Sequence, residues 1–320
     1  IDNRINIEAD WYTRNNFDLI GLIYTKGTGG QLAKFANVAS MKSSGVEFTV
    51  STRNIKTKDF SWNTDFIFSH TKNEVTDLQS NASVMDMISG NGFAMEGYPV
   101  RALFSMDFQG LNENGYPTFI NEKGQLTVSD INFQEQLKKD HLVYEGPTDP
   151  TMTGSLGNIF RYKGFTLNAF ITYSFGNVIR LDPVFHNVYS DLDAMPREFI
   201  NRWTTGGDEK VTNVPVIADK RANQQDPYLS YAYNAYNYST ERIAKGDFIR
   251  MKELSLSYNF PKKMISRLKV NDLSLKIQAT NLFLIYSDKK LNGQDPEFFN
   301  TGGVASPVPR QFTLTLRLGI

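Results

Sequence analysis

The chain has 320 residues, 34 basic against 34 acidic side chains, no cysteine and a mean hydropathy of -0.37. Balanced charge removes the electrostatic signature of a nucleic-acid-binding protein, and the missing cysteine excludes disulfides and thiolate chemistry. No apolar run approaches the roughly 18 residues of a transmembrane helix. A transmembrane β-barrel is still compatible with these values, because its strands carry the lipid signal as alternation and its polar loops lower the mean.

The chain opens inside an alternating segment, which predicts a two-faced strand. Its apolar row is Ile5, Ile7, Ala9 and Trp11, and its polar row is Asn6, Glu8, Asp10 and Tyr12. One row can face lipid while the other faces a wet lumen. No signal peptide precedes Ile1, so we expect a longer precursor and interpret the chain as a carboxyl-terminal fragment.

Period-two alternation predicts seven further strands, at about 45–53, 60–70, 156–162, 165–175, 248–260, 273–279 and 311–320. The last strand is the most regular. Its apolar row is Phe312, Leu314, Leu316, Leu318 and Ile320, and its other row is Thr313, Thr315, Arg317 and Gly319. An apolar face that runs to the end of the chain is typical of the closing strand of an outer-membrane barrel.

The connections between these strands alternate in length. The short ones are 54–59, 163–164 and 261–271, and the long ones are about 18–42, 73–152, 176–246 and 284–310. Outer-membrane barrels have short periplasmic turns and long extracellular loops. We therefore predict an all-β fold, an antiparallel transmembrane β-barrel wall of about eight strands whose long connections are extracellular.

Two further segments, 98–108 and 116–120, could pair as strands around the sequence "NENG". We assign them to an extracellular loop, because an odd strand in the wall would break the alternation of short and long connections. Eight strands are too few to enclose a pore for a nutrient, so the fragment needs further wall strands from upstream.

Several motifs resemble the SusC/RagA-type TonB-dependent transporters. The longest is "DFIRMKELSLSYNFP" from Asp247, and "TNLF" from Thr280, "DPE" from Asp295 and "PVPRQFTLTLRL" from Pro307 follow in the family's order. This resemblance implies that residues 1–320 are the C-terminal part of a roughly 22-stranded barrel with a plugged lumen, here without the plug domain and the N-terminal strands.

The same resemblance implies a multi-pass protein of the cell outer membrane that actively imports an oligosaccharide or a peptide. TonB would supply energy through the missing N-terminal region, and a SusD-like surface lipoprotein would act as partner. Membrane lipid would surround the wall. The wall motifs are shared by glycan and peptide importers, so the substrate stays open.

Long loops on a rigid wall are where specificity is expected. The segment 226–242 is rich in residues that stack on sugar rings or peptide bonds and hydrogen-bond their polar groups. The candidates for substrate or lid contact are Tyr228, Tyr231, Tyr233, Asn234, Tyr236, Asn237 and Tyr238, together with Trp203. The alternative is that these side chains pack the loop, and for Trp203 that it anchors a short helix.

No catalytic residue is predicted, because no nucleophile-elbow or paired-carboxylate motif occurs. The three histidines lack metal-ligand spacing, so no transition-metal site is expected. Asp191 and Asp193 resemble a carboxylate-rich calcium loop, although the glycine and distal glutamate of an EF-hand are absent. We therefore expect no cofactor, with calcium at this loop as the one alternative.

Two other functions stay open on the sequence. A secreted all-β adhesin or lectin would use the tyrosine-rich segment to bind glycans without transport, and it would stay soluble without detergent. An outer-membrane enzyme would use the barrel as a scaffold and would need a loop acid or serine for turnover.

Overall fold

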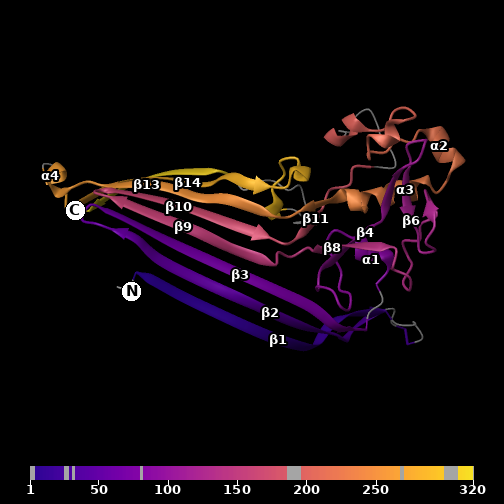
Figure 1. The fold of residues 1–320 in the computed structure, drawn as a ribbon, viewed down its shortest axis with the longest axis horizontal. Coiled ribbons are helices and arrows are strands. Elements are labelled where there is room, and N and C mark those ends of the chain that lie inside the picture. Colours follow the sequence, from indigo (N-terminus) through magenta and orange to yellow (C-terminus); the bar gives the residue numbers. More distant parts are fainter. Residues whose placement is uncertain are drawn as a thin grey trace.

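The computed structural model describes residues 4–24, 29–30, 33–79, 82–185, 196–266, 270–298 and 309–319. Eight antiparallel strands form one sheet in the order β1-β2-β3-β9-β10-β13-β14-β15 (Figure 1). Their bounds are β1 (Ile5–Tyr24), β2 (Ala33–Lys56), β3 (Phe60–Leu78), β9 (Met152–Tyr162), β10 (Phe165–Phe175), β13 (Phe248–Asn259), β14 (Asp272–Ser287) and β15 (Gln311–Gly319). The prediction of eight antiparallel wall strands is confirmed.

The three short connections lie at one end of this sheet, which we call the short-turn end. Strand register fixes this, because Phe60 pairs with Tyr162, Tyr162 with Phe165, and Phe165 with Tyr258 in one row across four strands. The predicted hairpin of Lys163 and Gly164 joins β9 to β10, and Lys163 has the positive φ of 51° that tight hairpin turns require. The helix α4 (Lys262–Ile265) lies in the third connection.

The loop predicted at about 18–42 is wrong, because β1 and β2 extend through most of it. Their register shifts between Asn16 and Leu19 and again between Leu19 and Ile20, and Asp18 has a φ of 55°. A bulge of this kind reverses which residues share a face, so alternation stops while the strand continues. The ends of β3 at Leu78 and β14 at Ser287 likewise take residues from predicted loops.

The described residues of the long connections, 79, 82–151, 176–185 and 196–247, fold together at the opposite end (Figure 1), and we call them the loop domain. The first contains α1 (Val84–Ile88), β4 (Ala102–Met106), β5 (Phe108–Leu111), β6 (Pro117–Ile120), β7 (Leu126–Thr127) and β8 (Leu142–Pro147). The second contains β11 (Val178–Arg180), α2 (Lys220–Gln225), α3 (Leu229–Asn237), β12 (Ile243–Lys245) and the 3-10 turns 197–201, 208–210 and 240–242. Because β4 pairs with β8 and β5 with β6, the assignment of these segments to a loop and not to the wall is confirmed.

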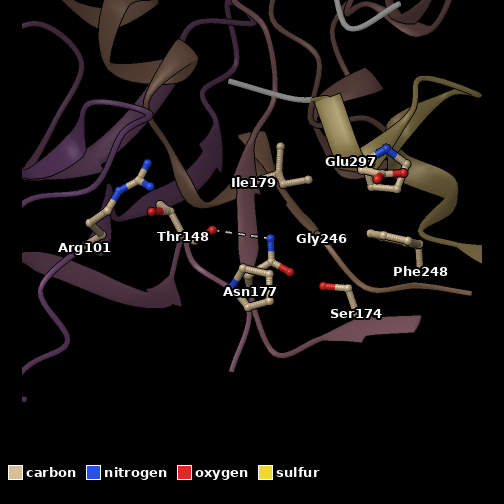
Figure 2. A pocket seen from close by; sticks show the side chains of 10 residues that line it. Arg101, Thr148, Ser174, Asn177, Ile179, Gly246, Phe248 and Glu297 are labelled. Atoms are coloured by element: carbon tan, nitrogen blue, oxygen red, sulfur yellow. Dashed lines mark hydrogen bonds between the residues drawn. The ribbon is translucent and has the colours of Figure 1, made fainter. Parts of the chain in front are cut away.

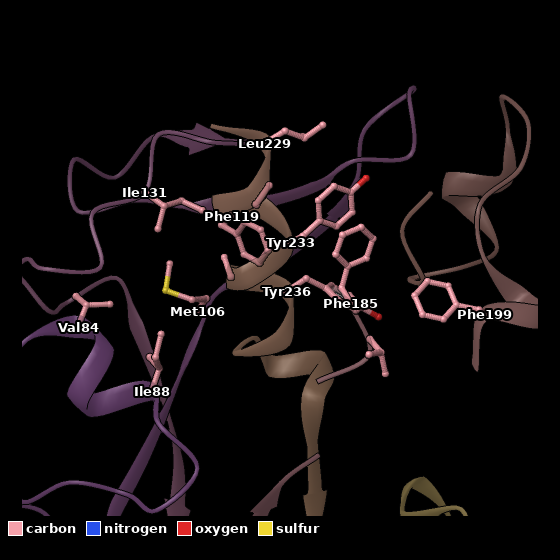
Figure 3. Packing of buried hydrophobic residues seen from close by; sticks show 13 residues of the cluster. Val84, Ile88, Met106, Phe119, Ile131, Phe185, Phe199, Leu229, Tyr233 and Tyr236 are labelled. Carbon is pink, nitrogen blue, oxygen red and sulfur yellow. The ribbon is translucent and has the colours of Figure 1, made fainter. Parts of the chain in front are cut away.

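Among the described residues, the hydrophobic clusters lie in the loop domain, and one of them adds Leu291 from the β14–β15 connection. The largest cluster surrounds α3 (Figure 3). The wall instead exposes its large apolar side chains, with exposed fractions of 75% for Trp11, 76% for Phe35 and 68% for Leu314. A sheet that buries so little of its apolar row needs an apolar solvent or a partner to cover it.

No helix in the described ranges is long and apolar enough to cross a membrane.

Candidate functional site

A cavity of about 300 Å³ lies where the wall meets the loop domain. From the wall it is lined by Ser174 at the end of β10 and Phe248 at the start of β13, which pair in register. Ser174 belongs to the polar row of β10 that also holds Thr166, Asn168 and Thr172. The cavity therefore opens on the face that the alternation assigns to the lumen, at the end where the long loops join the wall.

Figure 2 shows charged residues at opposite sides of this cavity, with Arg101 of the loop domain on one side and Glu297 on the other. The Arg101 guanidinium donates to Asp149 at 2.7 Å and through Nε to the carbonyl of Asn91 at 3.0 Å. These two hydrogen bonds hold the Arg101 side chain in place on its side of the cavity. The cavity offers oriented charge of both signs with little net charge, which suits polar or zwitterionic ligands better than a fully charged one.

Asn177 supplies the neutral polar contact of the cavity. Its Nδ2 donates to the carbonyl of Thr148 at 3.4 Å, the dashed line in Figure 2, and its backbone carbonyl accepts from the N–H of Gly246 at 2.9 Å. Its Oδ1 is buried and has no hydrogen-bond partner among the described residues. The Asn177 amide is therefore a neutral hydrogen-bonding group in the wall of the cavity.

An ion network fixes the Glu297 side of the cavity. Arg250 of β13 is almost fully buried and donates to Asp295 at 2.5 Å, and its Nε lies 3.1 Å from Glu297. Lys252 lies 3.5 Å from the same carboxylate. These contacts hold the 3-10 turn 296–298 of the β14–β15 connection against the wall beside Phe248.

This network joins two motifs that the sequence presents separately. Arg250 and Lys252 belong to the segment that starts at Asp247, and Asp295 and Glu297 are the acids of "DPE". Sequence reasoning did not single out these four residues or Arg101 as site residues. The signal was available in the complementary charge of the two motifs, although nothing in the sequence brings them together.

Parity alone would place Lys252 with Leu254 in the lipid-facing row, at the outer interface, and the structure places it elsewhere. The β10–β13 register shifts between Phe170 and Ile171, which pair with Glu253 and Met251 and leave Lys252 as the extra residue. A bulge breaks the period of two. Lys252 therefore meets Glu297 together with Arg250.

A second buried arginine organises the loop domain behind the cavity. Arg180 of β11 donates to the carbonyls of Ser239, Phe104 and Ile88 at 2.8, 2.6 and 3.3 Å. Burial lowers the pKa of Arg180 to about 10, against the opposing effect of the Glu145 carboxylate. Burial likewise raises the pKa of Glu145. One guanidinium thus ties together α1, β4 and the segment after α3.

The structure divides the predicted contact set into buried, accessible and half-buried residues. Tyr233 and Tyr236 lie in the core around α3 (Figure 3), and Asn237 is buried as well. Tyr233 stacks on Phe185 with ring centroids 3.5 Å apart and donates to the carbonyl of Val216 at 2.8 Å. Burial raises the pKa of the Tyr236 hydroxyl.

The Oδ1 of Asn237 accepts from the backbone N–H groups of Val184 and Phe185 at 3.1 and 3.2 Å. For Tyr233, Tyr236 and Asn237 the burial matches the packing alternative, because the loop core takes both their apolar area and their hydrogen bonds.

The other face of α3 is accessible. Tyr228 and Tyr231 are exposed, at 61% and 44%, and their ring centroids are 5.8 Å apart. Asn234, three residues further, is half-buried on the same face. Phe133 packs edge-on against Tyr231. These three polar and aromatic residues are the part of the predicted set that a partner or ligand can reach.

Trp203 and Tyr238 are half-buried and hold neighbouring segments. The Trp203 indole donates to Glu209 at 3.1 Å, and its backbone N–H donates to the carbonyl of Val214 at 2.9 Å. The Arg180 guanidinium lies over the ring of Tyr238, with its Cζ 5.9 Å from the ring centroid. Their positions match the anchoring alternative, and their contact with substrate stays a prediction.

The terminal strand β15 pairs with β14 and places Phe312, Leu314, Leu316 and Leu318 in one exposed row. Ile320 lies outside the described residues, as do Asp191 and Asp193 of the calcium alternative. Within the described ranges no group of three or more histidines and carboxylates is placed to hold a metal ion.

Comparison with known proteins gives relatives of one kind. No family model matches the chain. It is 24% identical over 310 residues to the TonB-dependent receptor P3 of Formosa agariphila, covering 92% of this chain and 29% of that protein. It is 25% identical over 337 residues to the TonB-dependent receptor SusC of Bacteroides thetaiotaomicron, covering 100% of this chain and 30% of that protein.

The fold is likewise similar to solved structures. A structure of the RagAB peptide transporter superposes with a TM-score of 0.74 at 21% identity, covering 99% of this chain and 34% of that one. The same importer in its open-open state gives 0.74 at 20% identity. The chain thus spans about a third of the length of the relatives it matches, and its sheet has the fold of part of a TonB-dependent transporter barrel.

Proposed function

We propose that this chain, a fragment of a SusC/RagA-type TonB-dependent transporter, supplies part of the wall and the outer loops of an active importer in the outer membrane. The observation that carries the proposal is the position of the cavity. The cavity lies on the polar face of the wall, between the loop domain and the last residues of β10 and first residues of β13. A solute that passes from the loops into the lumen would meet these side chains first.

The proposed substrate is an oligosaccharide or a peptide. Both present hydroxyl or amide donors and acceptors, which match the amide of Asn177 and the flanking charges of Arg101 and Glu297. A cavity of about 300 Å³ is at the lower limit of ligand pockets. It would therefore hold one sugar ring or one residue of a longer substrate, with the remainder bound by parts of the transporter outside this chain.

The proposed partners are a SusD-like surface lipoprotein and TonB. The lipoprotein would cover the loop domain, and the exposed face of α3 with Tyr228, Tyr231 and Asn234 is the surface we assign to that contact or to the substrate beneath it. TonB would act through the region that precedes this chain in the family. Relatives of this kind are transporters or receptors by name, and we propose no catalysis.

The first test is purification of the full-length transporter from detergent-solubilised outer membranes, with a tag inserted near Glu122 so that the terminal strand stays intact. We expect a parent chain much larger than 36.3 kDa together with a surface lipoprotein. Recovery of a soluble, solitary chain would refute the importer and favour the lectin.

The second test measures uptake of labelled oligosaccharide and peptide pools by cells with and without TonB. We expect one pool to accumulate only when TonB is present. A Ser174→Phe variant fills the cavity and should lower uptake, whereas Ala169→Phe, which adds nearly the same side-chain volume on the other face of the same strand, should not. Equal uptake by both variants at equal membrane levels would remove the cavity from the substrate path.

A further inference from the structure

Lysines are concentrated on the three short turns of the wall. Lys56 is the last residue of β2 and Lys58 lies in the β2–β3 turn, Lys163 belongs to the β9–β10 turn, and Lys262 and Lys263 belong to α4 in the β13–β14 turn. All five are exposed. In the described part of the chain, none of them forms an ion pair with a carboxylate. The chain as a whole has no net charge, whereas here the five lysines outnumber the two neighbouring carboxylates, Asp59 and Asp272, so this end is locally positive by placement.

These lysines lie next to the outward row of the wall. Tyr162, Phe165 and Tyr258 pair with one another in one register row at the short-turn end of the sheet. They lie on the same face of the sheet as the exposed Leu167 and Leu256. The Lys163 ammonium lies 5.3 Å from the centroid of the Tyr162 ring. The sulfur of Met264, beside Lys263, lies 4.0 Å from the Tyr258 hydroxyl. Two of the three turns therefore touch the outward aromatic row directly.

The arginines at this end take a different place. Arg161 pairs in register with Ser61 and Thr166, and Arg317 pairs with Ser274. These arginines therefore belong to the polar row that faces the lumen, whereas the turn lysines extend beyond the strands. The separation leaves a band of flexible ammonium groups just outside a ring of aromatic side chains. Aromatic rings of this kind mark the membrane interface, and lysines beside them reach the level of the lipid headgroups.

We propose that Lys56, Lys58, Lys163, Lys262 and Lys263 form a binding surface for the phosphate groups of anionic phospholipids in the membrane leaflet at the short-turn end. An ammonium is a compact charge with three donors, and it binds phosphate as a point charge. The five groups are distributed over three turns along the sheet order, which matches many separate headgroups better than one acidic protein segment. This surface is independent of the cavity and of the identity of the imported substrate.

The test uses the full-length transporter in detergent, with native mass spectrometry of bound phosphatidylglycerol and phosphatidylcholine that have identical acyl chains. We expect the wild type to retain phosphatidylglycerol over phosphatidylcholine by at least about threefold, with the preference falling as ionic strength rises. Changing all five lysines to glutamine should bring the ratio close to one.

The matched control changes five exposed lysines at the opposite end of the sheet to glutamine. They are Lys138, Lys210 and Lys220 of the loop domain and Lys289 and Lys290 of the β14–β15 connection. It removes the same charge and should keep the lipid preference. The proposal would be overturned if the variant of the five short-turn lysines kept the preference for phosphatidylglycerol. It would also be overturned if the control variant lost that preference to the same extent. Inorganic phosphate that abolishes the preference at matched concentration would also overturn it, since the site would then bind free phosphate. Uptake assays separate this surface from the proposed function, because the turn variant should still import.

Discussion

At the residue scale, Arg250 holds the Glu297 side of the cavity in position. Its side chain and that of Asp295 are 4% and 2% exposed, and Glu297 completes the contact. Removing one member of such a buried pair leaves an uncompensated charge, which costs far more than the pair itself contributes. The same network includes a partly exposed member, Lys252, so the chain carries its own comparison between a buried and a solvated cation.

We expect Arg250→Met to loosen residues 288–298 by about 3–5 kcal/mol. Lys252→Met should cost about 1 kcal/mol or less, because solvent screens its charge. The measurement is amide hydrogen exchange across 288–298 in the full-length transporter.

The double variant Arg250→Met with Asp295→Leu should recover much of the lost protection, since it removes the stranded carboxylate along with its partner. Equal exchange in the two single variants would show that the buried pair does not hold this connection.

At the element scale, α3 is a short amphipathic helix whose two faces have different tasks. Tyr233 and Tyr236 are inside, among the residues of the largest hydrophobic cluster, and Tyr228 and Tyr231 are outside. The tyrosine-rich composition of this segment is therefore two populations. One population supplies packing and hydrogen bonds for the loop domain, and the other is free for recognition.

Tyr233→Ala should destabilise the loop domain by about 3–5 kcal/mol, as for other large aromatic side chains removed from a core. Tyr231→Ala should cost less than about 1 kcal/mol, because 44% of Tyr231 is already exposed and it lies outside the core cluster. Hydrogen exchange of α3 and β6 in the full-length protein measures both. Recovery of the surface lipoprotein with each variant then tests the outer face, where Tyr231→Ala should weaken the contact without raising exchange. If Tyr231→Ala raises exchange as much as Tyr233→Ala, the two faces are not distinct.

At the scale of the whole molecule, two solvents divide the chain. The loop domain buries its apolar residues in its own clusters, as a water-soluble domain does. The wall exposes an apolar row on one face and a polar row on the other, which is stable only when lipid covers the first and water the second. The strands β1 and β2 have 20 and 24 residues, so they continue past the 9–11 residues that a membrane-spanning strand needs.

A charge placed on either face of β15 tests this division. Leu314→Arg, in the apolar row near the middle of the strand, should cost about 2–4 kcal/mol in a bilayer. Thr313→Arg, one residue earlier on the polar row and opposite the neutral Gln278, should cost much less. Folding of the full-length barrel in lipid vesicles with a urea titration gives both values. A wall that tolerates arginine equally on both faces would not be a lipid-exposed barrel.

The sequence by itself determined the wall: eight strands, the tight turn at Lys163 and Gly164, the apolar row of β15 and the placement of 98–120 outside the sheet. A period-two pattern is local, and it records which solvent each face meets, so one strand is enough to read it. Where a bulge interrupts the period, as at Asp18 and Lys252, the same reading failed.

Only the tertiary structure decided the site. It brought Arg250 to Asp295 and Glu297, placed Asn177 beside Thr148, and assigned Tyr233 to the core and Tyr231 to the surface. These outcomes depend on which loops fold against which strands. Residues tens of positions apart carry no periodic signal of their contact, and burial of a tyrosine depends on its neighbours and not on its own chemistry.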